Sequence, residues 1–198
     1  MAHLSKPLRT MKRILILLLA LMPVMANAQK VTSNERSETG IRTISTGSRA
    51  FFVDRDMHMC QLSYMEEDGK AFYDIMFMIS EQASRWVVKP GQKILMKDSA
   101  GEVYTIVSNG VSQSQLTRSI DRGVCYCTAS SYLLDEDTAK VLDNGLVKIR
   151  IEYTYQDDGH ESIMDIDIPA DLTNYLKKAK KNIDKTIPMP VTVDKSVF

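Results

Sequence analysis

Histidine and cysteine are the side chains in this sequence best suited to chemistry, and the chain carries few of them. Beyond the leader described below there are two histidines, His58 and His160, and three cysteines, Cys60, Cys125 and Cys127. The pairs His58-x-Cys60 and Cys125-x-Cys127 have the i, i+2 spacing that places two side chains on one face of a β-strand. On two neighbouring strands, these pairs would form the Cys₃His set of a tetrahedral zinc site.

A disulfide competes with this zinc site, because an exported chain meets an oxidising compartment. We expect a bridge from Cys60 to either Cys125 or Cys127, which leaves one thiol over. The bridge would close a loop of about 65 residues and stabilise the fold by roughly 4 kcal/mol on loop-entropy grounds. In the third interpretation the cysteines are small buried apolar side chains. Zinc is the least favoured of the three, since zinc ribbons use C-x₂-C on a turn. We therefore assign no metal and no cofactor.

An enzyme built on this chain would depend on one of the two histidines, because a Ser or Cys nucleophile needs a general base. The sequence contains no G-x-S-x-G motif. His160 lies in an acidic turn that does not match an EF-hand loop and is typical of a solvated hairpin tip. We favour an exported non-catalytic binding or accessory protein of unknown ligand. The alternative is a small extracytoplasmic hydrolase or metal-dependent enzyme that uses His58 or His160.

The N-terminal segment Met1–Ala28 has the pattern of an export signal. Basic residues precede the apolar run Ile14–Met25, which is too short to span a bilayer. Ala26-Asn27-Ala28 has the small-x-small cleavage pattern, so we expect cleavage near Ala28. Both Met1 and Met11 begin a complete signal. These features predict a periplasmic or secreted protein with no membrane span in the mature chain.

Charge and length limit the partners of the mature chain. Removing 28 of 198 residues leaves 170, and it lowers the 25 Lys and Arg by four while all 25 Asp and Glu remain, a balance of −4. A mildly acidic chain is a poor general binder of nucleic acid, which is held mostly by neutralising its phosphates. We expect a flexible polar lead-in at 29–49 with room for one short strand near Ile41–Ile44, a single domain at 50–187 and a tail at 188–198. The partner should be an unknown envelope or extracellular molecule.

Most of the elements that position these side chains should be strands. Ala71–Ile79 is almost wholly apolar and predicts a central strand buried on both faces. Its partner in a hairpin should be His58–Tyr64, across a turn that ends in Asp68-Gly69. We interpret the methionines of these two strands as core filling. Further strands are expected at 50–53, 92–97, 102–107, 123–130, 147–155 and 163–168.

Two helices complete the predicted fold. Asp135–Asn144 should form a short helix, and Pro169 should begin a C-terminal helix with an apolar stripe around Leu176. A single helical turn is expected at 80–86, and a long loop or weak helix at 110–122. The fold class is therefore α+β, mainly an antiparallel sheet of seven or eight strands (a sandwich or partial barrel) with a short helix and a C-terminal helix packed on it.

Two segments of the chain also have similar patterns. Ala71–Val107 and Gly123–Ile168 have the same order of elements, and Lys93-Ile94 and Lys148-Ile149 occupy like positions in the two segments. This pattern is typical of a duplicated unit. Coincidence among short strands explains it equally well.

The order of elements resembles that of a group of small uncharacterised exported proteins of Bacteroidetes-type bacteria. The resemblance covers the MKR…ANAQ leader and a set of segments between residues 71 and 183. These are Lys89-Pro-Gly-Gln-Lys-Ile-Leu-Met, Glu102-Val-Tyr-Thr-Ile, Tyr132-Leu-Leu, Gly145-Leu-Val-Lys-Ile-Arg150 and a closing Lys-rich helix. It implies export and a β-rich domain, and it supplies no activity. Cys125-x-Cys127 departs from this pattern.

Overall fold

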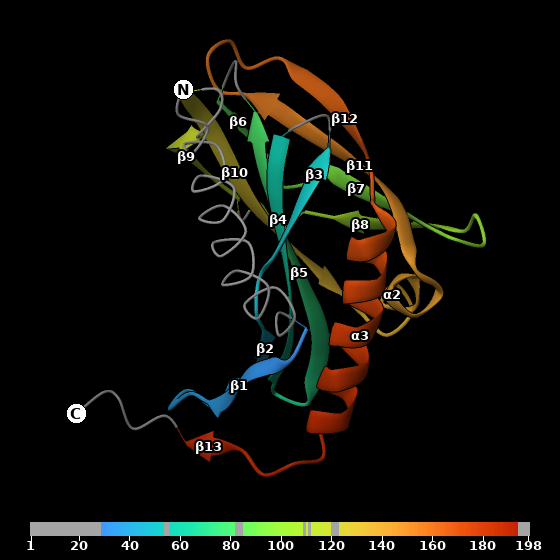
Figure 1. Ribbon diagram of the computed structural model, residues 1–198. Helices are drawn as coiled ribbons and strands as arrows, with labels where there is room; N and C mark the ends of the chain where they lie inside the picture. Colours follow the sequence, from blue (N-terminus) through green and yellow to red (C-terminus); the bar gives the residue numbers. More distant parts are fainter. Residues whose placement is uncertain are drawn as a thin grey trace, which may run out of the picture.

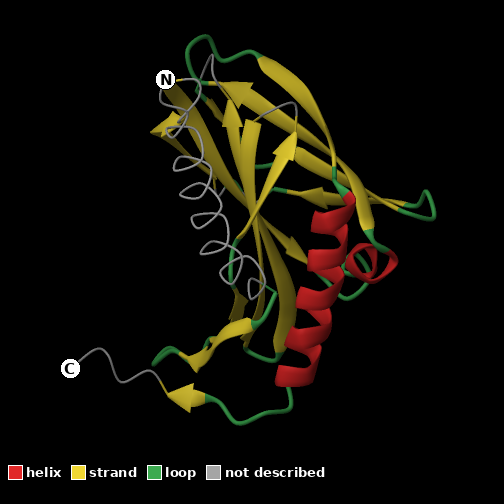
Figure 2. Cartoon of the chain, in the orientation of Figure 1, coloured by secondary structure: helices red, strands yellow, loops and turns green. Residues whose placement is uncertain are grey.

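Two β-sheets and two helices form the part of the chain that the computed structural model describes, namely residues 29–53, 56–81, 85–108, 110, 112–119 and 123–193 (Figures 1 and 2). The larger sheet has the order β13-β1-β2-β4-β5-β10-β9, and β3 pairs with β4 beside β2. The smaller sheet has the order β12-β11-β7-β8, and β6 pairs with β11. All pairs are antiparallel except β1 with β13. The predicted α+β class with a sandwich-like arrangement is confirmed.

The strands of the larger sheet are β1 (Val31–Arg36), β2 (Arg42–Thr46), β3 (Arg49–Val53), β4 (Asp56–Glu67), β5 (Lys70–Glu81), β9 (Ser112–Ser119), β10 (Gly123–Leu134) and β13 (Thr192–Val193). Those of the smaller sheet are β6 (Trp86–Val87), β7 (Lys93–Asp98), β8 (Val103–Val107), β11 (Leu146–Tyr155) and β12 (Glu161–Asp167). The helices are α2 (Lys140–Asn144) and α3 (Ala170–Thr186).

The hairpin of β4 and β5 forms as the sequence predicted. Glu67 pairs with Lys70, so only Asp68 and Gly69 remain in the loop. Both have positive φ, 49° and 76°, as a type I′ turn requires. The twist of this turn matches that of the strands, which fixes the register of the whole pair.

Helix α3 covers one end of the inner face of the larger sheet, and the smaller sheet covers the other end (Figure 1). The predicted apolar stripe is confirmed, with buried side chains at Leu172, Tyr175, Leu176, Ala179 and Ile183. The Tyr175 hydroxyl donates a 2.6 Å hydrogen bond to the Gly47 carbonyl. This contact ties the helix to the bend between β2 and β3.

Strand β5 is buried on one face only, so the prediction of burial on both faces is wrong. Ile75, Phe77 and Ile79 are buried, whereas Asp74, Met76, Met78 and the other alternate residues are half-buried. The reason is that α3 and the smaller sheet lie on the same side of the larger sheet.

Three other segments differ from the sequence-based expectation. The lead-in at 29–49 contains β1 and β2, whose buried positions include the polar Arg42 and Thr46. Ser80, Glu81 and Trp86 lie in strands and not in a helical turn, and residues 82–84 are outside the described part. The expected loop at 110–122 contains the edge strand β9. β2 matches the short strand expected near Ile41–Ile44, whereas β1 and β9 are mostly polar, so apolar alternation could not reveal them.

The two halves of the fold repeat one arrangement, which supports duplication. Each half gives one hairpin to the larger sheet (β4–β5 or β9–β10) and one to the smaller sheet (β7–β8 or β11–β12). β5 pairs with β10, and β7 pairs with β11. Met76 lies opposite Ser131 and Leu95 opposite Arg150, and both differences (131 minus 76, 150 minus 95) equal 55. A two-fold axis through these pairs exchanges residue i with residue i+55 in the four central strands.

Candidate functional site

The candidate chemical residues do not come together. His58 and Cys60 share the buried face of β4, as their spacing predicted. Cys60 lies opposite Phe77 of β5, whereas Cys127 lies opposite Ser80 of the same strand. Because 77 and 80 differ by an odd number, Cys60 and Cys127 point to opposite faces of the larger sheet.

The expected disulfide from Cys60 to Cys125 or Cys127 does not form, because Cys60 has a free thiol. Strand β5 separates β4 from β10, which places their Cα atoms at least about 9.6 Å apart, beyond the roughly 7 Å reach of a disulfide. Burial raises the pKa of the Cys60 thiol, so it stays protonated. Cys125 lies in β10, but its side chain is outside the described part.

The weak zinc candidates were His58, Cys60, Cys125 and Cys127, of which the side chain of Cys125 is outside the described part. The opposite orientations of Cys60 and Cys127 keep these two from sharing one metal ion. Among the described side chains, no three of the His, Cys, Asp and Glu residues come close enough to hold a metal ion. His58 accepts a 3.2 Å hydrogen bond at Nδ1 from the Ser80 backbone N–H. Its ring centroid lies 5.2 Å from that of Phe51. These contacts fit a histidine that holds neighbouring strands in register.

His160 lies at the tip of the β11–β12 hairpin, as the sequence predicted. Its Nδ1 is 2.7 Å from the Asp158 carboxylate, and its ring centroid is 4.4 Å from that of Tyr155. The backbone N–H of His160 also donates to Asp158 and helps to hold the pKa of this carboxyl below its usual range. The exposed imidazole thus orders a turn. Its contacts with Asp158 and Tyr155 do not include a nucleophile.

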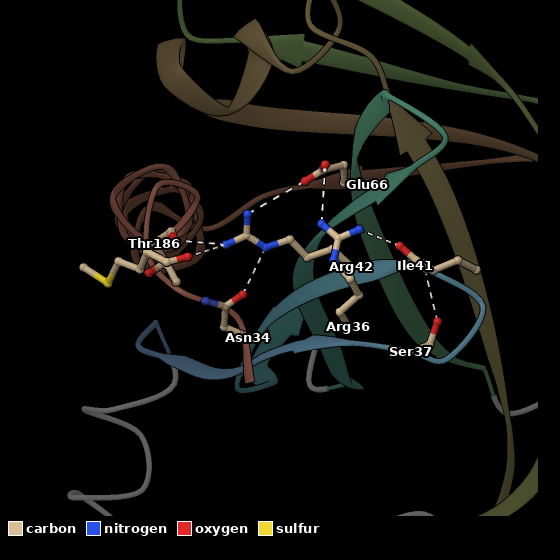
Figure 3. Close-up of polar contacts among 9 residues, drawn as sticks. Asn34, Arg36, Ser37, Ile41, Arg42, Glu66 and Thr186 are labelled. Atoms are coloured by element: carbon tan, nitrogen blue, oxygen red, sulfur yellow. Dashed lines mark hydrogen bonds and ion pairs between the residues drawn. The ribbon is translucent and has the colours of Figure 1, made fainter. Parts of the chain in front are cut away.

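A polar network joins the end of α3 to the larger sheet (Figure 3). Arg42 is only 6% exposed. It donates to the Thr186 carbonyl at 3.3 Å, to the Met189 carbonyl at 3.2 Å and to Asn34 Oδ1 at 3.1 Å, and it lies 3.8 Å from Glu66. A cation is favourable at a helix C-terminus, where carbonyl groups lack partners. Each nitrogen of its guanidinium is therefore engaged in holding the fold together.

The outer face of the smaller sheet carries charges that pair across strands. Arg150 donates to both oxygens of Asp165, at 2.7 and 2.8 Å, and Lys148 lies 3.5 Å from Asp165 and 3.8 Å from Asp167. The hydrogen bonds from Arg150 lower the pKa of Asp165 to about 2. Two shallow clefts of about 290 and 220 Å³ lie on this face, and neither is lined by a histidine.

The outer face of the larger sheet carries a group of apolar side chains on β3, β4, β5 and β10. We call this part the methionine face, and its apolar members are Phe52, Met57, Met59, Met65, Phe72, Met76, Met78, Ala129 and Leu133. Polar side chains, among them Gln61, Ser63, Asp74 and Ser131, lie between them. Cross-strand pairs join part of it: Phe52 lies opposite Met57, and Met78 lies between Met59 and Ala129, whereas Met76 lies between Gln61 and Ser131. Phe52 is 61% exposed and Met57 52%. No described helix or second sheet lies over this face (Figure 1).

The sequence analysis interpreted these methionines as core filling, and that interpretation is wrong for the methionine face. Both faces of β5 are apolar in sequence, so periodicity gives no sign of which face is covered. The signal that could have found the site is Asp74, a single carboxylate inside an apolar strand.

Comparison with known proteins gives no relative on which to base a function: no protein family, curated protein or solved structure matches the chain. Among the described residues, no helix is long and apolar enough to cross a membrane.

Proposed function

We propose that this protein is exported and acts as a non-catalytic binding or accessory protein, which binds its envelope or extracellular partner with the methionine face. The observation that carries the proposal is the exposure of Phe52, Met57 and Leu133 around half-buried methionines, on a face that no described helix or second sheet covers. Contiguous apolar surface of this kind marks interaction sites in proteins. Methionine suits such a surface, because its flexible and polarisable side chain adapts to different partners.

The hydrolase alternative has less support from the described residues. His58 lies in the core, where its Nδ1 accepts the Ser80 N–H, and His160 lies on a hairpin tip beside Asp158. Neither histidine lines one of the two clefts. A hydrolase of the expected kind needs one of them beside a nucleophile or metal and a substrate pocket.

Site-specific photo-cross-linking in cells that express the full chain tests this proposal. A benzophenone amino acid replaces Met78 on the methionine face or, as the matched control, Lys97 on the outer face of the smaller sheet. We expect an adduct in the envelope or medium from position 78 and none from position 97. The substitution Met59→Glu, which places a charge beside residue 78, should abolish the adduct.

Two results would contradict the proposal. Equal adducts from positions 78 and 97 would show that the methionine face has no special role. An intact mass that retains the leader Met1–Ala28, in protein that stays in the cytoplasm, would refute export.

A further inference from the structure

Asp74 occupies the centre of the methionine face. Its cross-strand neighbours are Ser63 on β4 and Leu133 on β10. Ser131 donates a 2.5 Å hydrogen bond to Asp74 Oδ1. No Lys or Arg among the described residues forms an ion pair with this half-buried carboxylate. The face therefore presents one acid without a counter-charge.

The fold itself does not require this acid. Burial raises the pKa of Asp74, although hydrogen bonds from Ser131 and the Tyr132 N–H oppose the rise. The ionised carboxylate therefore lowers the stability of the fold near neutral pH. The position related to Asp74 by the internal two-fold axis is Ala129, which fills the equivalent place in β10 without a charge.

Charge complementarity indicates what should cover the face. Asp165 and Asp167 on the outer face of the smaller sheet already have cationic partners in the chain. Asp74 lacks such a partner. Its neighbours on the same face include the apolar Phe72, Met76 and Leu133 as well as the polar Ser63 and Ser131. Resting on the proposed function, we infer that the methionine face binds an apolar polypeptide segment that carries a basic side chain, and that Asp74 pairs with this side chain.

Two other occupants fit the charge less well. A second copy packed face to face would bring another Asp74 against an apolar surface, and like charges in such a place repel each other. An anionic lipid surface would also be repelled, because Asp74 is the only charged side chain at the centre of the described face. A cationic side chain on an apolar segment has neither disadvantage, and its hydrogen bond to a carboxylate is charge-assisted.

Fluorescence anisotropy with three labelled peptides tests the inference on the chain that begins at Gln29. The probe is Gly-Ser-Leu-Val-Lys-Leu-Val-Ser-Gly, and two matched peptides carry norleucine or glutamate in place of lysine. We expect the lysine peptide to bind about tenfold more tightly than the norleucine peptide, and the glutamate peptide to bind least. Asp74→Asn should remove the preference for lysine and leave the norleucine peptide unaffected. Asp167→Asn, which removes a charge from the other outer face, should change none of the three.

Other outcomes would overturn the inference. Equal binding of all three peptides would refute the role of Asp74 while leaving an apolar binding face, and thus the proposed function, intact. A chain that sediments as a dimer, and becomes a monomer on Met78→Glu, would identify a second copy as the occupant. Absence of binding by all three peptides would refute a polypeptide segment of this kind, and the cross-linking experiment would still judge the proposed function separately.

Discussion

The two outer faces of the molecule are built on the same strand pattern and have opposite chemistry. On the smaller sheet, Arg150 and Lys148 find acidic partners directly across the strand pair. On the larger sheet, Asp74 lies between Ser63 and Leu133 on a face that carries several methionines, and it has no cationic partner in the described chain. Both faces leave apolar side chains exposed, Val103 and Ile163 on the first and Phe52 and Met57 on the second, but Asp165 has a cationic partner on the first face whereas Asp74 has none on the second. We therefore expect the methionine face, and not the outer face of the smaller sheet, to bind a partner.

Both faces depend on a shared core, and Leu176→Asp should have the largest effect because it destroys that core. Leu176 lies on the buried face of α3, and its side chain is fully buried. The variant would therefore bury an unpaired carboxylate at a cost of about 4 kcal/mol or more. We expect an unfolded or molten chain by near-ultraviolet circular dichroism. Lys178→Asp on the exposed side of α3 is the control, and it should fold. An unchanged melting temperature for Leu176→Asp would refute the packing of α3.

Arg42→Met tests whether a buried charge contributes more to the stability of the fold than an exposed charge does. It leaves the Thr186 and Met189 carbonyls without their donor, and it leaves Glu66 without a close partner in β2. We expect a loss of roughly 2–3 kcal/mol in urea unfolding at pH 7. Arg36→Met, at a more exposed arginine near the same Glu66, should cost much less. Equal losses of unfolding free energy in the two variants would show that the burial of Arg42 does not increase its contribution to stability.

Asp74→Asn should stabilise the protein, which is unusual for a substitution. The folded-state pKa of Asp74 is raised, so the native state binds more protons than the unfolded state above the ordinary aspartate pKa of about 4. The free energy of unfolding of the natural chain therefore falls as pH rises through this window. We expect the variant to gain on the order of 0.5 kcal/mol at pH 7 and nothing at pH 3. A loss of stability at pH 7 would contradict the cost assigned to this carboxylate.

Arg150→Met should have the smallest effect of the four. Arg150 is exposed, and its ion pair with Asp165 is accessible to water and salt. We expect its melting temperature to stay close to that of the natural chain in 0.5 M NaCl, with a small decrease only at low salt. A large decrease that salt does not reduce would show that the outer face of the smaller sheet is also part of the structural framework.

The sequence predicted the elements whose signals are local. Asp68-Gly69 located the hairpin of β4 and β5, and the spacing of Leu172, Leu176 and Ile183 located α3. It could not predict β9, because an edge strand with one wet face needs few apolar residues. The relation of Cys60 to Cys127 depends on β5 lying between their strands, which is a property of the sheet order. The exposure of the methionine face was missed for a similar reason, because which side of β5 is covered depends on how distant segments of the chain pack against the sheet.

The internal two-fold axis has a consequence for how a partner would lie. Met76 and Ser131 mark the axis on the larger sheet, and a perfectly repeated surface there would accept a chain running in either direction. Asp74 and Ala129 break that equivalence, because only one of the two related positions is charged. A segment whose cationic side chain pairs with Asp74 is consequently offset to one side of the axis. One N-to-C direction is then favoured, and reversing the sequence of the segment should weaken its binding.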